Sequence, residues 1–262
     1  MQASPPVPTN RLADAQMANA AAETAGRELL TLRSTGAARL RNGQDLGKLG
    51  DRRSHELLAS LLAAAYPTDS ILSEESADDP QRLTSDRVWI IDPLDGTREY
   101  GEPGRTDWAV HVALVEDGDL VLGVVALPAL RLTFSSETPT PLPPRKGPIR
   151  LTVSRTRAPA LAAAVGARLG ATLIPMGSAG AKTMSIIVGE SDVYLHSGGQ
   201  YEWDSAAPVA VARAFELHAS RIDGSPLIYN RFPAWQPDLL ICRPELAATV
   251  LRLIEEESAA NP

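Results

Sequence analysis

Residues 107 to 134, DWAVHVALVEDGDLVLGVVALPALRLTF, contain two apolar runs that meet at an Asp-Gly pair. Apolar and polar residues alternate along these runs, which is typical of strands. Asp117-Gly118 is a strong signal for a hairpin turn between two such strands. The pattern resumes after Pro128 and predicts a third strand. These residues therefore require an antiparallel sheet in the first half of the chain.

The segments that precede this sheet predict two helices and two strands. Apolar spacing and a high alanine content indicate a helix over residues 11 to 34, and a second helix over residues 53 to 65 stops before Pro67. SILSEES, residues 70 to 76, is typical of a short strand that runs into a polar turn. RVWII, residues 87 to 91, is typical of a strand buried on both faces.

The second half has a different pattern, and a proline-rich stretch separates the two halves. Residues 136 to 148, SETPTPLPPRKGP, mark a lobe boundary or an exposed excursion. Beyond them, predicted strands mostly alternate with helices, which suggests a second, α/β layer. The strands are IRLTVS, ATLIPM, DVYLHS, ELHASRI and DLLICR, and the helices span 158 to 169, 179 to 189, 204 to 215 and 244 to 256. We expect a disordered tail over residues 1 to 10, an α+β metal-binding lobe over 11 to 148 and a smaller α/β substrate lobe over 149 to 262.

Composition and charge exclude several classes of protein. The net charge of −7 argues against a nucleic-acid-binding surface, although bound divalent cations could still attract an anionic substrate. The N-terminus, MQASPPVPTN, has no signal-peptide pattern, and no apolar run approaches the length of a membrane span. The lone Cys242 is predicted in a buried strand and forms no internal disulfide, which is compatible with a reducing cytosol. We expect a cytoplasmic protein that binds neither nucleic acid nor membranes.

The stretch WIIDPLDGT, residues 89 to 97, ends a buried strand with two carboxylates, where an ordinary turn needs only one. The proline between them stiffens the turn, and the glycine after them permits close backbone approach. Asp92 and Asp95 can then point to one side, with the Leu94 carbonyl between them. This all-oxygen ligand set suits Mg²⁺ better than zinc.

Two further acidic features strengthen the case for a metal site. SEES places Glu74 and Glu75 at another strand end, and YEWDSAA places Asp204 at the start of an apolar helix. Taken alone, Asp204 could be a helix N-cap and SEES an ordinary turn. Together, the three features predict a hydrolytic site in which two cations about 4 Å apart share Asp92, activate a water and stabilise the leaving oxygen of a phosphate ester.

The rival motif of haloacid-dehalogenase-type phosphatases, Asp-x-Asp-Gly-Thr, does not fit this stretch. The aspartates here are three positions apart instead of two, and Pro93 cannot supply the nucleophile that the rival spacing requires. If Gly96 and Thr97 open a helix, their N–H groups would instead face a phosphate.

SEES, WIIDPLDGT and WDSAA, in this order, resemble the motifs of the inositol monophosphatase superfamily of Mg²⁺-dependent, lithium-sensitive phosphatases. The resemblance covers nearly the whole chain from about residue 11, and it implies the layered αβαβα sandwich of that superfamily, an α/β fold. Three further stretches are similar to the CysQ branch of 3'(2'),5'-bisphosphate nucleotidases, most of all to its actinobacterial form. They are DGTREY, MGSAGAKTM and DGSPLIYN.

The resemblance implies two or three Mg²⁺ ions in one site. One ion would bind Glu74, Asp92 and the Leu94 carbonyl. A second ion would bind Asp92, Asp95 and Asp204. A third, weaker ion would bind Glu74 and waters.

The resemblance also implies direct in-line attack by a metal-activated water, without a covalent phosphoenzyme. Glu74 and Thr97 would orient the water, and Asp51 would polarise Thr97. The superfamily's usual Thr-x-Ala-Asp helix start reads Lys-Leu-Gly-Asp here, so its threonine is missing, and Asp51 could equally be a helix N-cap. The four histidines are interpreted as structural or substrate-rim residues.

The residues expected to face the substrate lie in residues 95 to 98, in residues 177 to 182 and at the start of the helix predicted from residue 204. In the resemblance, Gly177, Ser178 and Lys182 lie against the substrate. Lys182 would suit a second phosphate through its point charge, unless it is only a solvated helix residue, and Arg98 is the other candidate for that phosphate. The full expected set is Asp95, Gly96, Thr97, Arg98, Gly177, Ser178, Lys182 and Asp204.

The implied activity is hydrolysis of the 3'-phosphate of 3'-phosphoadenosine 5'-phosphate to AMP and phosphate in sulfur assimilation, with the sulfated precursor as a further substrate. An inositol-1-phosphate or fructose-1,6-bisphosphate phosphatase is the alternative within the superfamily. A non-catalytic phosphate-binding protein is disfavoured, because every metal-ligand position is filled. Homodimers are common in the superfamily, so the resemblance is compatible with either a homodimer or a monomer.

Overall fold

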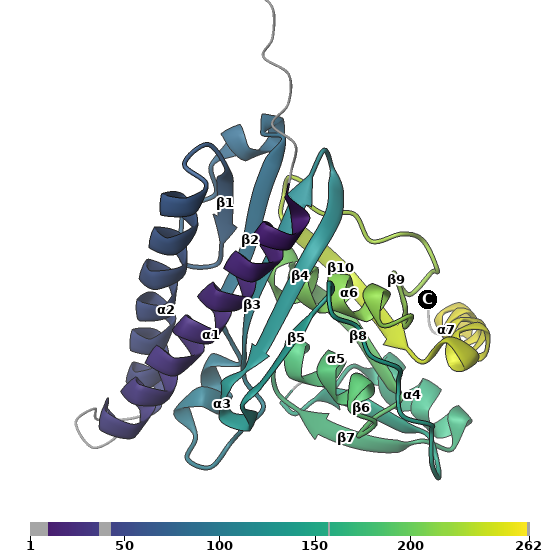
Figure 1. Ribbon diagram of the computed structural model, residues 1–262. Coiled ribbons are helices and arrows are strands. Elements are labelled where there is room, and N and C mark those ends of the chain that lie inside the picture. The colour runs from purple at the N-terminus through teal and green to yellow at the C-terminus, as the bar shows by residue number, and fades with distance from the viewer. Residues whose placement is uncertain (1–9, 37–42, 157, 261–262) are drawn as a thin grey trace, which may run out of the picture.

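The structure, a computed structural model, describes residues 10–36, 43–156 and 158–260, so residues 1–9 of the expected disordered tail lie outside the described residues. Within this part of the chain, two five-stranded sheets and the helices stack in the order helices, sheet, helices, sheet, helices (Figure 1). Each sheet thus has both faces covered, which lets the apolar residues of both faces be buried. The expected αβαβα sandwich is confirmed.

The first sheet has the strand order β1-β2-β3-β4-β5. Its strands are β1 (Ser70–Ser73), β2 (Arg87–Asp95), β3 (Ala109–Glu116), β4 (Asp119–Leu127) and β5 (Leu132–Ser135). The predicted hairpin is confirmed, because Glu116 pairs with Asp119 and both turn residues between them have the positive φ of a tight hairpin turn. The expected antiparallel sheet is confirmed for β2 to β5, and β1 joins its edge parallel to β2.

Two long helices, α1 (Arg11–Gly36) and α2 (Gly43–Ala65), cover the outer face of this sheet. The predicted start of α2 at residue 53 is wrong by about three turns. The extra turns contain Gly47 and Gly50, which favour other conformations in isolation. A Cβ at Gly47 would lie 2.7 Å from the Thr97 side chain, and one at Gly50 would lie 2.8 Å from Tyr100, so close packing requires glycine there.

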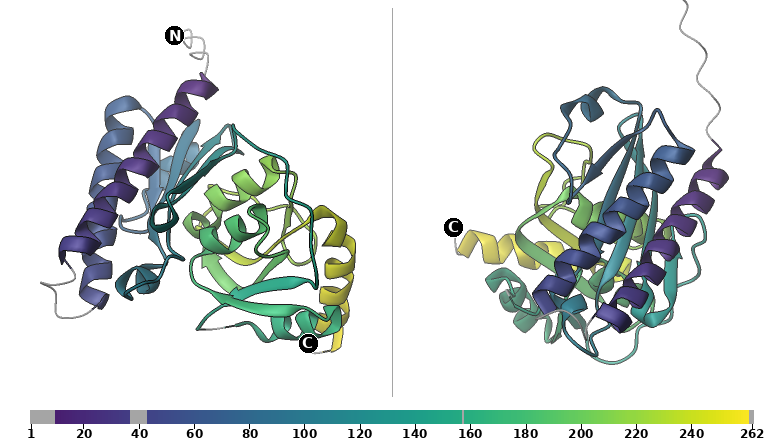
Figure 2. Two further views of the ribbon diagram at one scale, coloured as in Figure 1. Left: turned by 60° about the horizontal axis from the view of Figure 1, so that its bottom comes forward. Right: turned by 90° about the vertical axis from the view of Figure 1, so that its left-hand side faces the viewer.

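Helices α5 (Ala179–Ile187) and α6 (Glu202–Ala214) form the middle layer between the two sheets (Figure 2). Their apolar side chains join those of the inner faces of both sheets in one buried core. This core includes Ile90 and Val125 from the first sheet, Met184 and Val209 from the helices, and Ile241 from the second sheet. The start of each middle helix therefore lies where both sheets can be reached.

The second sheet has the strand order β7-β6-β8-β10-β9. Its strands are β6 (Arg150–Ser154), β7 (Thr172–Met176), β8 (Val193–Tyr201), β9 (His218–Ser220) and β10 (Trp235–Cys242). Helices α4 (Ala160–Leu169) and α7 (Ala247–Ala260) cover its outer face. The five strands and four helices expected in this half are all present, and Cys242 is fully buried in β10 as expected.

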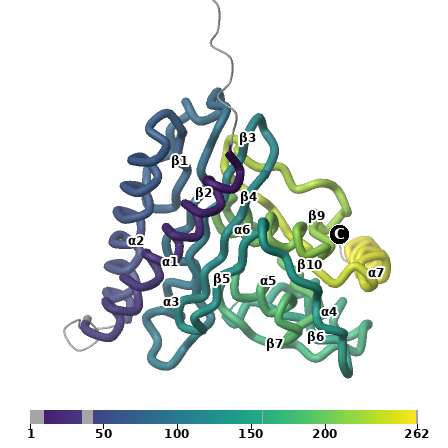
Figure 3. The backbone as a smooth tube through the Cα atoms, viewed as in Figure 1, coloured from purple at the N-terminus to yellow at the C-terminus, as the bar shows by residue number. Residues whose placement is uncertain are grey.

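The proline-rich stretch connects β5 to β6, and Figure 3 shows this teal segment passing along the second half of the chain. The Pro143 carbonyl accepts a hydrogen bond of 2.8 Å from Arg243, and Leu142 packs against the middle core. The segment is thus held against the fold at these two residues, while the division into lobes at residue 148 stays a prediction. Among the described helices, none combines the length and the apolar character that a membrane span requires.

Candidate active site

Strand β2 delivers two aspartates to one end of the first sheet. Asp92 pairs with His111 of β3 and Asp95 pairs with Ala109, so the register shifts between them and β2 bulges. Pro93 lies inside this bulge, where its missing N–H costs no ladder hydrogen bond. The Leu94 N–H donates to Asp92 Oδ1 at 3.1 Å, which fixes the carboxylate beside the bulge.

A third carboxylate comes from α6, between the sheets. Ligand oxygens of Asp92, Asp95 and Asp204 all lie within 4.8 Å of one another, and the first two side chains are buried. Asp204 is the third residue of α6, and Tyr201 is the N-cap, so the simple N-cap interpretation of Asp204 is wrong. Asp204 Oδ2 still accepts a hydrogen bond of 2.7 Å from the Tyr201 N–H, which holds the carboxylate at the helix start.

Burial and mutual repulsion make this cluster unfavourable as a set of free anions. Burial and the neighbouring Asp95 raise the pKa of Asp92 well above its ordinary value. Burial and Asp204 raise the pKa of Glu74 to about 7, and burial and Asp95 raise that of Asp204 to about 6. A bound cation would reverse these shifts. Because every donor is an oxygen, the set fits a hard divalent cation.

Asp95 is the exception, because its surroundings favour the charged form. Ser178 Oγ donates to Asp95 Oδ2 at 2.5 Å, and the Gly180 N–H donates to the same oxygen at 2.8 Å. Burial would raise the pKa of Asp95, but His111, Lys182 and Ser178 together lower it below its ordinary value. Ser178 was expected to face the substrate, and the structure places its hydroxyl on this carboxylate.

His111 is a site residue that sequence reasoning did not single out. Its Nε2 lies 3.2 Å from Asp95 Oδ2, and the side chain is fully buried. Its Nδ1 lies 3.2 Å from the Trp203 carbonyl, one residue before Asp204. The only sequence signal is positional, because His111 lies on a predicted strand that could pair with the end of β2.

Thr97 opens the short helix α3 (Thr97–Gly101), directly after Gly96 in the left-handed conformation. Its Oγ1 lies 3.0 Å from the Leu94 carbonyl and 3.4 Å from Asp51 Oδ2, and its single proton can serve only one of these acceptors. Asp51 is buried in the middle of α2, so its N-cap interpretation is wrong. Burial and Glu74 raise the pKa of Asp51 to about 8.

Glu74 directly follows β1 and is the most exposed of the expected ligands. Its carboxylate lies outside the tight group formed by Asp92, Asp95 and Asp204. Its charge nevertheless raises the pKa of Asp51 and of Asp92, so it faces the same site.

Lys182 lies in α5 and is buried, so the solvated interpretation is wrong. Its Nζ donates a long hydrogen bond of 3.4 Å to the Gly177 carbonyl and lies 5.0 Å from the centre of the Tyr194 ring. Burial lowers the pKa of Lys182, although Asp95 and Asp204 oppose this shift. The ammonium thus lies beside the acidic cluster with weak hydrogen bonding of its own.

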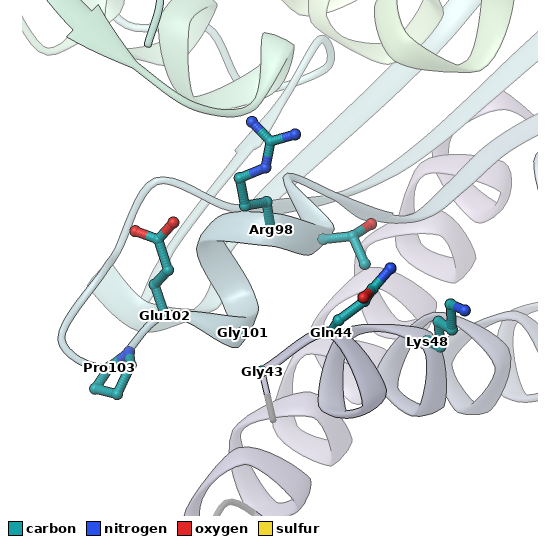
Figure 4. A pocket seen from close by; sticks show the side chains of 8 residues that line it. Gly43, Gln44, Lys48, Arg98, Gly101, Glu102 and Pro103 are labelled. Atoms are coloured by element: carbon teal, nitrogen blue, oxygen red, sulfur yellow. The ribbon is translucent and has the colours of Figure 1, made fainter. Parts of the chain in front are cut away.

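Arg98 is exposed on α3 beside a cavity of about 640 Å³. Figure 4 shows its guanidinium extending to the side of α3 away from Lys48. Arg98 forms no ion pair with any residue in the described part of the chain. The cavity is lined by Gly43, Gln44, Lys48, Thr97, Arg98, Gly101, Glu102 and Pro103.

Comparison with known proteins gives a consistent result. A family model described as the inositol monophosphatase family matches residues 11–142. A Mycobacterium bovis protein named 3'-phosphoadenosine 5'-phosphate phosphatase is 48% identical over 80% of this chain and 82% of its own length. A Mycobacterium leprae protein of the same name is 45% identical over 94% of both chains.

The fold comparison agrees. The crystal structure of CysQ from Bacteroides thetaiotaomicron matches with a TM-score of 0.76 and 24% identity, over 88% of this chain and 97% of that chain. The match to the family model and the identity to the two mycobacterial proteins show that this chain belongs to the inositol monophosphatase family.

Proposed function

We propose that this chain is a Mg²⁺-dependent phosphatase that hydrolyses the 3'-phosphate of 3'-phosphoadenosine 5'-phosphate to give AMP and phosphate. Its 5'-phosphosulfate analogue would be a second substrate, and the reaction would serve sulfur assimilation in the cytoplasm. The substrate follows the printed name of the mycobacterial relatives, which are 45 to 48% identical to this chain. The observation that carries the chemistry is the group of Asp92, Asp95 and Asp204, whose oxygens lie within 4.8 Å of one another.

The proposed metal ligands divide between two positions that share Asp92. Glu74, Asp92 and the Leu94 carbonyl would hold one ion. Asp92, Asp95 and Asp204 would hold a second, and Glu74 would support a third. When bound, Mg²⁺ would neutralise these carboxylates, polarise the phosphate and activate water.

The residues around Thr97 would orient the attacking water. When Thr97 donates its proton to Asp51, at 3.4 Å, the lone pairs of Oγ1 are free to accept from a water. Glu74 would take up the proton that this water loses as it attacks. The water oxygen forms a bond to phosphorus as the bond to the 3'-oxygen breaks, and the leaving oxygen takes up a proton from solvent.

The second phosphate of the substrate needs positive charge near the acidic cluster. Lys182 and Arg98 are the proposed partners, because Lys182 is weakly hydrogen-bonded beside the cluster and Arg98 is exposed beyond Thr97. We further propose that backbone and hydroxyl groups of Gly96, Thr97, Gly177 and Ser178 line the substrate site.

The test is a substrate profile. Initial rates of phosphate release are measured with Mg²⁺ on 3'-phosphoadenosine 5'-phosphate, inositol 1-phosphate and fructose 1,6-bisphosphate. We expect the nucleotide to have the highest kcat/KM of the three. If its kcat/KM is lower than that of either other substrate, the substrate assignment is wrong. Lithium should inhibit the reaction, and complete indifference to lithium would count against the proposed metal site.

A further inference from the structure

The connector between β1 and β2 is tied to the segment before β10 through a buried arginine. Arg82, in the 3-10 helix η1 (Pro80–Thr84), is 1% exposed. Its guanidinium donates to both carboxylate oxygens of Asp78, at 2.6 and 2.8 Å. It also donates to Asn230 Oδ1 at 2.6 Å and to the Arg231 carbonyl at 2.8 Å. Asn230 Nδ2 in turn donates to the Arg82 carbonyl at 3.2 Å.

The same segment before β10 is tied to the start of α6. The backbone N–H groups of Asn230 and Arg231 donate to the two carboxylate oxygens of Glu202, at 2.7 and 2.8 Å. Glu202 is fully buried and is the first residue of α6. A continuous path of hydrogen bonds therefore runs from η1 through residues 230–231 to α6. In Figure 1 the blue connector and the yellow-green segment before β10 lie side by side at the upper end of the molecule.

Both ends of this path carry a proposed metal ligand. Glu74 lies four residues before Asp78 in the same connector, and Asp204 lies two residues after Glu202. Neither ligand is itself part of the path. Whatever fixes these two segments relative to each other therefore also fixes where the two ligands lie.

We propose that Arg82, Asn230 and Glu202 form a clamp that positions Glu74 and Asp204 for metal binding; the proposal rests on the proposed function only for the identity of these two ligands. None of the three clamp residues is a proposed metal ligand, and they act by holding backbone segments in place. Buried ion pairs and amides contribute little net stability compared with apolar packing, but they accept only one geometry. The clamp therefore acts on Mg²⁺ affinity by fixing where the two ligands lie.

Asn230 offers a variant that weakens the clamp without straining the backbone. Its φ is +58°, a conformation that glycine adopts without strain. Asn230→Gly removes both side-chain bonds to Arg82, and it keeps the N–H that donates to Glu202 and the Arg82 bond to the Arg231 carbonyl. Asn230→Asp keeps the acceptor for Arg82 and is the conservative partner.

The experiment measures Mg²⁺ binding directly by calorimetry and, in parallel, the Mg²⁺ concentration that gives half-maximal phosphate release. We expect Asn230→Gly to weaken Mg²⁺ binding by about 10-fold, the lower end of the range seen when residues bonded directly to metal ligands are lost, because Asn230 acts through the backbone. The rate at saturating Mg²⁺ should fall by less than about threefold, and Asn230→Asp should bind within about threefold of the unmodified protein.

The matched control is the Arg221–Asp238 pair, which is also bidentate, at 2.6 Å for both bonds, and lies on neither segment. Arg221→Gln should leave Mg²⁺ affinity unchanged. A folded Asn230→Gly protein that binds Mg²⁺ as tightly as the unmodified protein would overturn the clamp. If that variant does not fold, Asp78→Asn replaces it, because the Asp78 side chain is 29% exposed and the same loss of affinity is expected.

The experiment tests the clamp separately from the proposed function. If the unmodified protein binds Mg²⁺ but releases no phosphate from the nucleotide, the function is wrong and the calorimetric comparison still decides on the clamp. If the nucleotide is hydrolysed and all variants bind Mg²⁺ equally, the clamp is wrong and the function stands.

Discussion

Asp92 is the residue on which the proposed chemistry depends most, because it is shared between the two proposed metal positions. We predict that Asp92→Asn lowers phosphate release at least about 100-fold, more than the loss of an outer-shell partner costs. Without Mg²⁺ the variant should melt no lower than the unmodified protein, since a neutral amide avoids the cost of burying a charge and the repulsion that together raise the pKa of Asp92. Rates and melting temperatures measured on the same preparation check both statements.

Asp86, an exposed carboxylate just before β2, gives the control for this substitution. Asp86→Asn should keep full activity. An Asp92→Asn protein with more than a tenth of the original rate would rule out the shared-ligand scheme.

Lys182 provides a second prediction at the residue scale. Lys182→Met should lower kcat/KM for 3'-phosphoadenosine 5'-phosphate by about 10- to 100-fold, because a hydrogen bond to a charged group contributes about 1.5–3 kcal/mol. For adenosine 3'-phosphate, which lacks the second phosphate, the loss should be within about threefold. Equal losses for both nucleotides would assign Lys182 to the fold or to the metal site instead. Lys146→Met, in the proline-rich stretch, is the control.

The role of a single residue could be predicted from the sequence where the residues that act with it lie in one short stretch. Asp92, Asp95 and Thr97 occur within six residues, so their chemistry can be recognised without the fold. His111 and Arg82 could not, because their partners lie far along the chain: Arg82 meets Asn230 across 148 positions. Propensity and motif spacing carry no information about such contacts.

At the scale of elements, the early start of α2 leads to a prediction. A Cβ at Gly47 would lie 2.7 Å from the Thr97 side chain, so Gly47→Ala should displace α3 and lower kcat about tenfold or more. Gly26→Ala in α1 is the control, because its Cβ would also lie 2.7 Å from a neighbour, Pro128, away from the site. Both variants should lose similar stability. Equal activity of the two would show that the contact between α2 and α3 does not position Thr97.

The elements that sequence reasoning placed wrongly or left open share a physical cause. Gly47 and Gly50 disfavour a helix locally, and only packing against α3 makes them suitable. Likewise, four residues of β1 cannot reveal that their neighbour runs parallel, since the direction is set by the crossover through η1. The elements with long, regular patterns, such as the β3–β4 hairpin, were predicted correctly because local and tertiary preferences agree there.

At the scale of the whole molecule, the acidic site joins elements from different layers, since Asp92 and Asp95 come from the first sheet and Asp204 from the middle helices. A bound cation should therefore stabilise the entire fold. The folded-state pKa is raised from 4.5 to about 7 for Glu74, from 3.8 to about 8 for Asp51 and from 3.8 to about 6 for Asp204. Without metal, the contribution of these three groups to stability is thus greatest at low pH and falls as the pH rises from about 4 to 8, because they ionise in the unfolded chain before they ionise in the folded protein.

Mg²⁺ should reverse this loss, so the rise in melting temperature on adding Mg²⁺ is predicted to be larger at pH 8 than at pH 5.5. A difference of at least about 3 °C is expected, because 1 kcal/mol corresponds to about 2–4 °C for a chain of this size. Melting curves recorded with EDTA and with excess Mg²⁺ at both pH values measure this difference. If Mg²⁺ raises the melting temperature equally at the two pH values, the carboxylates with raised pKa values do not bind the ion.

The central claim is that the carboxylate cluster cuts the 3'-phosphate ester of a nucleotide bisphosphate with the help of Mg²⁺. The most direct measurement is phosphorus NMR of 3'-phosphoadenosine 5'-phosphate incubated with the protein, with Mg²⁺ and with EDTA. We predict adenosine 5'-phosphate and inorganic phosphate in equal amounts, and only in the sample with Mg²⁺. Adenosine 3'-phosphate as the product, or the same rate in EDTA, would contradict the account.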